Sequence, residues 1–232
     1  PIEDEAAAAL CATLLAATGA SALRTLHLGG TGAGDASAAA CAEAMEANAE
    51  LQLHALCISS TVSNAGAVRL AAALPFATHL TELWLGDQVG DDGAEALLHA
   101  IYMPAAPEEG RPRSELRTLG LGGEAQSGVV LRNPLGERTA NLLCELPKTT
   151  CSLQDVRLSG CADIGGMGCL KLLSALQDTV PPPKRARDVV LPEPCRLRTL
   201  HLDDCGLTTE QLPRFLGALD QVWVLHELKI DN

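Results

Sequence analysis

Residues 197–207 read Leu-Arg-Thr-Leu-His-Leu-Asp-Asp-Cys-Gly-Leu. The spacing of the first three leucines recurs along the chain as Leu-x-x-Leu-x-Leu, with Ile or Val in some of the leucine positions. Because seven copies of such a pattern do not arise by chance, we infer that the chain is a tandem repeat. The copies begin at Leu23, Leu53, Leu80, Leu116, Leu153, Leu197 and Leu225.

Each repeat is predicted to be a strand, a turn and a helix. The alternation Leu-x-Leu suits a short strand, and turn residues and an Ala- and Leu-rich segment follow it. In residues 89–101 the apolar side chains have helical spacing, and Asp91 or Asp92 is expected to cap the start of this helix. Further on, Thr208 and Gln211 have the spacing of a capping box.

The repeat resembles the ribonuclease-inhibitor-type leucine-rich repeat, which is also found in Ran GTPase-activating proteins and NOD-like receptors. Residues 197–207 match that family's Leu-x-x-Leu-x-Leu-x-x-(Asn/Cys)-x-Leu in full, with Cys205 in the Asn/Cys position. Residues 153–163 match it through Cys161, with two departures. The resemblance covers essentially the whole chain. It implies an α/β fold: a right-handed solenoid, or horseshoe, with a parallel sheet on the concave face and helices on the convex face.

The other repeats depart from the family at the Asn/Cys position. Thr31, Thr61, Gln88 and Glu124 stand there. Thr and Gln can still form hydrogen bonds with the backbone of a turn. At Glu124 we expect the turn to be rebuilt.

The repeats are expected to form a single domain over residues 1–232, interrupted by insertion loops near 104–115, 122–134 and 180–195. Residues 2–15 have the pattern of a helix that belongs to a preceding repeat, and the last repeat stops after its strand. Because solenoids need polar capping repeats at their ends, we expect the chain to be a fragment or the ordered part of a longer protein.

Composition and charge exclude several classes of partner. The formal net charge of -12 argues against binding to nucleic-acid phosphates and is compatible with a protein partner that has a basic face. No apolar run is long enough to span a bilayer. The nine cysteines include no Cys-x-x-Cys pair, so we predict no zinc site and free thiols in a reducing intracellular compartment, cytoplasmic or cytoskeletal.

Two short motifs have a structural alternative to a functional reading. Gly30, Gly32 and Gly34 follow a strand, but they lack the spacing of a dinucleotide-binding loop, and the repeat already explains them. The segment Pro183-Lys184-Arg185-Ala186-Arg187 resembles a nuclear-import signal; the alternative is a solvated loop.

The candidate binding residues occupy the strand positions between the leucines, because side chains alternate along a strand and these point away from the helices. Trp84 should be exposed there, and Trp and Arg are the residue types favoured at interfaces. The alternative for Trp84 is packing over Cys57 or Gly120, and for Arg157 it is an ion-pair ladder with neighbouring acids. The predicted set, with acids just past the strands, is His27, Glu82, Trp84, Asp87, Asp155, Arg157, His201, Asp203 and Lys229.

The expected function is that of a scaffold which binds a protein partner through its concave face and insertion loops. The histidines stand too far apart to share a metal or a catalytic role, so we predict no enzyme activity, cofactor or metal. Three alternatives stay open. They are a structural subunit of a large ciliary or cytoskeletal assembly, a Ran-type GTPase-activating protein, and the sensing domain of an immune receptor.

Overall fold

A computed structural model gives the structure of the chain. The predicted insertion loop at 180–195, most of the loop at 104–115, and the motif at 183–187 lie outside the residues that it describes. The described residues are 2–16, 22–102, 114–125, 128–146, 152–177, 197–219, 222 and 225–230, with the backbone alone at 59 and 60.

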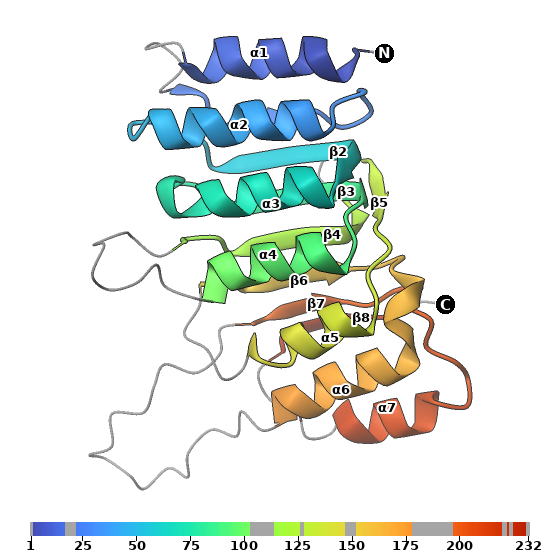
Figure 1. Ribbon diagram of the computed structural model, residues 1–232. Helices are drawn as coiled ribbons and strands as arrows, with labels where there is room; N and C mark the ends of the chain where they lie inside the picture. The colour runs from blue at the N-terminus through green and yellow to red at the C-terminus, as the bar shows by residue number, and fades with distance from the viewer. Residues whose placement is uncertain are drawn as a thin grey trace, which may run out of the picture.

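Strands and helices alternate along the chain, as the repeat predicts (Figure 1). The helices are α1 (Asp4–Ala16), α2 (Asp35–Ala47), α3 (Asn64–Ala73), α4 (Asp91–Tyr102), α5 (Glu137–Leu143), α6 (Gly165–Gln177) and α7 (Leu212–Leu219), with 3-10 turns at η2 (Leu74–Phe76) and η5 (Ala162–Ile164). The strands are β1 (Thr25–His27), β2 (Ala55–Ser63), β3 (Glu82–Gln88), β4 (Thr118–Glu124), β5 (Val130–Arg132), β6 (Asp155–Leu158), β7 (Thr199–His201) and β8 (Glu227–Lys229). Helix α1 is the predicted helix that precedes the first repeat.

The strands form one open sheet in the order β1-β2-β3-β4-β6-β7-β8, and neighbours in this series are parallel. The repeat sets the register, since Leu200 in β7 lies beside Val156 in β6 and Leu228 in β8. Strand β5 stands outside the series and pairs antiparallel with the end of β4. The predicted α/β fold with a parallel sheet is confirmed.

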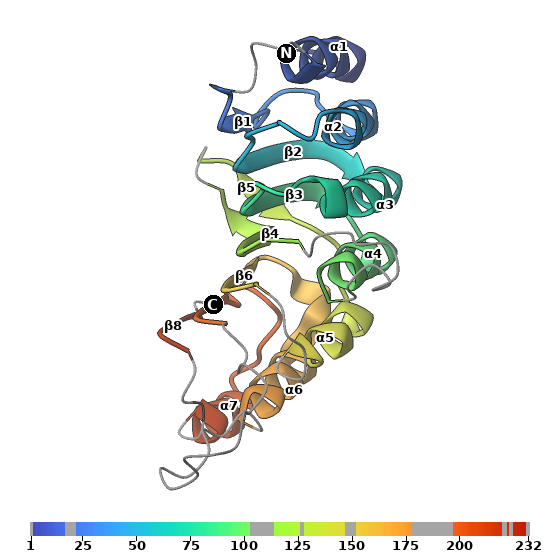
Figure 2. The same ribbon diagram turned by 90° about the vertical axis from the view of Figure 1, so that its left-hand side faces the viewer.

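The helices form a second layer that covers one face of the sheet. Figure 2 shows them stacked in chain order from α1 to α7, in a row that bends with the sheet on its inner side. The strand leucines point into the space between the layers; Leu119 and Leu121 of β4 are at most 1% exposed. Across from such leucines lie small helix residues such as Ala94, so the core is thin and continuous. A complete right-handed horseshoe stays a prediction.

Asn133 holds the turn where the fourth repeat departs from the pattern. Its amide oxygen accepts the N–H of Val89 at 2.9 Å. Its amide nitrogen donates to the carbonyl oxygens of Leu85 and Leu121 at 2.7 and 2.8 Å. Glu124, which occupies the Asn/Cys position by counting, ends β4 instead. The predicted rebuilding of this turn is confirmed, and Asn133 is the residue that rebuilds it.

Two cysteines in the Asn/Cys position link neighbouring repeats in a similar way. The thiol of Cys161 donates to the carbonyl of Leu121 at 3.4 Å, and that of Cys205 donates to the carbonyl of Leu158 at 3.1 Å. Burial raises the pKa of the Cys161 thiol to about 12. A hydrogen bond with Cys169, together with burial, raises the pKa of Cys205 well above its ordinary value. Both thiols therefore keep the proton that they donate.

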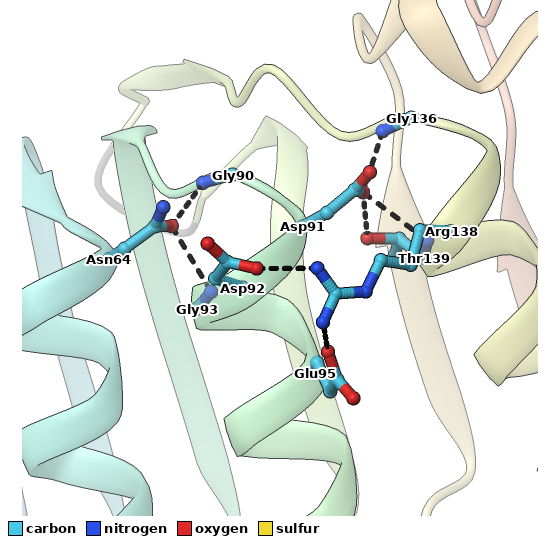
Figure 3. A network of polar contacts seen from close by, with 9 residues as sticks. All are labelled: Asn64, Gly90, Asp91, Asp92, Gly93, Glu95, Gly136, Arg138 and Thr139. Carbon is cyan, nitrogen blue, oxygen red and sulfur yellow. Dashed lines mark hydrogen bonds and ion pairs between the residues drawn. The ribbon is translucent and has the colours of Figure 1, made fainter.

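The first residue of a helix often caps the next helix rather than its own. Asn64 of α3 accepts the N–H of Gly90 at 2.7 Å before α4 (Figure 3). Asp91 of α4 accepts the N–H groups of Gly136 and Thr139 at 2.8 and 3.2 Å, at the start of α5. The expectation that Asp91 caps its own helix is wrong, because the helix N-termini lie side by side and its carboxylate reaches the unpaired N–H groups of the neighbour.

Asp4 and Asp35 extend this series to the first helices. Asp4 accepts the N–H of Gly34 at 2.7 Å and Asp35 that of Ser63 at 2.8 Å. Burial would raise the pKa of Asp4, but hydrogen bonds from the Ser37 side chain and from backbone N–H groups outweigh it, and the pKa is lowered. The caps thus carry negative charge toward the positive ends of the helix dipoles.

Two other expected caps have different outcomes. Asp92 is not a cap: it forms an exposed ion pair with Arg138, 2.5 Å from oxygen to nitrogen (Figure 3). The capping box before α7 is confirmed on its Gln side, because the side-chain oxygen of Gln211 accepts the N–H of Thr208 at 3.0 Å.

Candidate functional site

The non-leucine strand residues lie in rows on the sheet face that is turned away from the helices, as the alternation predicts. Parallel pairing brings equivalent residues of successive repeats side by side. One row runs Glu82, Thr118, Asp155, Thr199 and Glu227, and the next runs Trp84, Gly120, Arg157, His201 and Lys229.

The hairpin of β4 and β5 covers part of this face. Ala125, Val129 and Leu131 of the hairpin pack against Cys57 and Trp84, in a small apolar cluster separate from the main core. Trp84 is only 2% exposed. The predicted exposure of Trp84 is therefore wrong, because the alternation along a strand gives no sign of a distant hairpin that folds back over it.

The packing alternative for Trp84 is confirmed. A Cβ atom added to Gly120 would lie 2.0 Å from Cε3 of the indole, so the ring lies directly against this glycine. The guanidinium carbon of Arg157 lies 5.0 Å from the centre of the ring, a cation–π distance. The indole of Trp84 therefore packs against the guanidinium of Arg157 and is too buried to contact a partner directly.

Two more predicted residues lie apart from the rest. His27 is in β1, at the far end of the sheet. The Asp87 carboxylate accepts the N–H of Arg132 at 2.9 Å, so it anchors the hairpin to β3. The remaining predicted residues line two hollows over strands β3 to β8, and we call the surface that contains both hollows the open face.

The strand-end hollow, of about 400 Å³, lies where the strands finish. One Asp203 oxygen accepts the hydroxyl of Ser159 at 2.8 Å and lies 3.7 Å from the ammonium of Lys229. The other oxygen is buried and has no hydrogen-bond partner among the described residues. The hollow is lined by Gly123, Glu124, Ala125, Arg157, Ser159, His201, Asp203 and Lys229.

Pairs of polar side chains lie on the open face within and between strands. Arg157 binds Asp155 through Nε and a terminal nitrogen, at 3.0 to 3.2 Å. His201 lies 3.2 Å from a carboxylate oxygen of Glu227. The predicted intramolecular ion pairing of Arg157 is confirmed for Asp155, so this carboxylate is already neutralised within the chain.

The strand-start hollow, of about 310 Å³, contains two residues that sequence reasoning missed. Arg117 and Arg198 directly precede β4 and β7, and both are exposed. The sequence feature that indicates them is an arginine in the second position of the repeat, as in Leu-Arg-Thr-Leu. The hollow is lined by Thr81, Glu82, Arg117, Thr118, Gln154, Asp155, Arg198 and Thr199.

Two other kinds of feature are absent from the part of the chain that the structure describes. No group of three or more His, Cys, Asp or Glu side chains there could hold a metal ion, and no helix there is long and apolar enough to cross a membrane. The N–H groups of the glycine-rich turn are used in packing: Gly32 donates to the carbonyl of Ile2 and Gly34 to Asp4, both at 2.7 Å.

Comparison with known proteins gives a structural likeness alone. No family model and no curated protein matches the chain. A solved structure that does match is the tropomodulin C-terminal domain of Caenorhabditis elegans, at a TM-score of 0.45 and 15% identity, over 92% of each chain. The architecture is leucine-rich-repeat-like. That statement rests on the strand–helix units of this chain. A structural match at this level carries no argument about the fold or the partners of this chain.

Proposed function

We propose that the chain is a protein-binding scaffold of the ribonuclease-inhibitor-like kind and that its partner docks on the open face. The observation that carries the proposal is the position of the two hollows, side by side on the sheet face that the helices leave uncovered. A curved, rigid surface with clustered polar groups suits recognition of another protein. No enzyme activity is part of the proposal.

The charge of the chain favours a partner that has a basic face. The net charge is -12, and Glu124 and Asp203 place two carboxylates at the strand-end hollow. Asp203 has one buried oxygen that still lacks a donor among the described residues. That buried oxygen is out of a partner's reach, so a lysine or arginine of the partner would pair with the exposed carboxylate of Glu124, while the overall negative potential speeds the encounter. The described cysteines are free thiols, which suits a reducing cellular compartment.

Affinity capture with two charge-reversed variants tests the proposal. The first, Glu124→Lys with Glu227→Lys, replaces two exposed acids of the open face with cations, which would repel a basic partner. The control, Asp92→Lys with Glu137→Lys, makes the same change in charge at two exposed acids of the helix layer. We expect a partner captured by the wild type to be lost at least about tenfold in the first variant and kept in the control.

The readout is quantitative mass spectrometry of partners from a lysate of the source organism, after circular dichroism has established that all three proteins are folded. Equal capture by both variants would contradict docking on the open face. Loss in the control alone would instead favour the alternative of a subunit that joins a large assembly through its helices.

A further inference from the structure

Several hydrogen-bond donors that line the strand-start hollow have no side-chain partner among the described residues. Among the described residues, neither Arg117 nor Arg198 makes a hydrogen bond or ion pair through its guanidinium. The hydroxyls of Thr118 and Thr199 and the side-chain amide of Gln154 make none there either. Five side chains that can donate hydrogen bonds, two of them permanently charged, therefore line the hollow without a side-chain partner among the described residues.

The two acids that line this hollow, Glu82 and Asp155, form no ion pair with Arg117 or Arg198. Asp155 lies in the same hollow, but its two oxygens are already bound to Arg157, which reaches it from the strand-end side. Because the charge of Asp155 is already balanced by the bidentate contact with Arg157, the exposed guanidiniums of Arg117 and Arg198 are not neutralised by it.

The spacing of the two arginines suits one acidic group between them. Strands β4 and β7 are separated by β6 alone, so the starts of the two arginine side chains lie about 10 Å apart, given the usual spacing of strands. An acidic group above Gln154, on the strand between them, is about 5 Å from each neighbouring strand. Both guanidiniums can reach it from opposite sides, with the two threonine hydroxyls beneath.

We propose that the strand-start hollow binds the carboxylate of an Asp or Glu side chain of the docked protein partner. The proposal rests on the proposed function and adds an acidic anchor to it. The partner then carries opposite charges at two places: an acid over Arg117 and Arg198, and basic groups over the strand-end hollow. A polyanion such as a nucleic acid is disfavoured, because the net charge of -12 repels it.

The experiment uses two blocked tripeptides as probes, acetyl-Gly-Glu-Gly-amide and its Gln counterpart, with inorganic phosphate as a third. The probes are titrated into the isotope-labelled chain, and the NMR signals of the arginine Nε–H groups and of the Gln154 side-chain amide are followed. We expect the Glu peptide to shift the Arg117 and Arg198 signals with saturation in the millimolar range, and the Gln peptide not to do so.

Matched variants separate the site from general attraction to charge. Arg117→Gln and Arg198→Gln should each weaken the Glu peptide by about tenfold, as expected for the loss of one charged hydrogen bond. Arg214→Gln, which removes the same charge from an exposed position on α7, should leave binding unchanged.

Three results would overturn the inference: no saturable shift, equal shifts with the Glu and Gln peptides, or tighter binding of phosphate at the same Nε–H groups.

The capture assay distinguishes failure of this inference from failure of the proposed function. If Arg117→Gln with Arg198→Gln still captures the partner fully while Glu124→Lys with Glu227→Lys does not, the scaffold function stands and the acidic anchor fails.

Discussion

Replacing Asn133 with alanine should lower the free energy of unfolding by about 3–5 kcal/mol. The side chain is buried at 2% exposure and satisfies three backbone groups, the N–H of Val89 and the carbonyls of Leu85 and Leu121. Alanine leaves all three without partners inside the turn, and each buried polar group left unpaired costs about 1–3 kcal/mol. Urea unfolding of the two proteins measures the difference.

Asn141→Ala is the matched control for this prediction. Asn141 is an exposed residue of α5, and its side chain meets only the ammonium of Lys171, at 3.1 Å. We expect its replacement to change the free energy of unfolding by less than about 0.5 kcal/mol. A cost for Asn133→Ala as small as that of the control would mean that this asparagine does not hold the turn.

Gly120→Ala should destabilise the chain by about 2–3 kcal/mol, because the new methyl group overpacks a closed site. Its carbon would lie 2.0 Å from Cε3 of Trp84, with the hairpin residue Leu131 in the same cluster. Either the indole or the hairpin must move. In contrast, Gly217 in α7 has no atom within 4 Å of an added Cβ, so Gly217→Ala should be neutral or slightly stabilising.

A double-mutant cycle attributes the cost of Gly120→Ala to the indole. In a Trp84→Leu background the ring is gone, and we expect Gly120→Ala to cost less than about 1 kcal/mol. Thermal or urea unfolding of the four proteins gives the coupling. A cost that stays the same in both backgrounds would show that Trp84 does not lie against Gly120.

The sequence predicts the strands and helices well because each repeat encodes them locally. The leucine spacing gives the strands and their register, since equivalent leucines of neighbouring repeats become sheet neighbours. Contacts between repeats were harder to foresee. Asp91 follows the local rule for an N-terminal cap, yet the N–H groups that it accepts belong to a helix 45 residues further on. Capping rules treat one helix at a time and cannot supply that neighbour.

The candidate site was predicted in part. Alternation along the strands placed Arg157, His201 and Lys229 correctly in one row. It fails at Trp84, because strand β5 lies in a segment that breaks the repeat and has the sequence pattern of an insertion loop. Alternation does not predict Arg117, because it concerns only the positions between the leucines of the strand and Arg117 stands just before β4.

The most direct test of docking on the open face is an acetylation footprint of the lysines with the captured partner bound. Lys229, on the open face, and Lys171, on the helix layer, have side chains that are 60% and 40% exposed, so both are open to the reagent in the free chain. Docking on the open face predicts that the partner protects Lys229 and leaves the reactivity of Lys171 unchanged. Protection of Lys171 with Lys229 still fully reactive would contradict it.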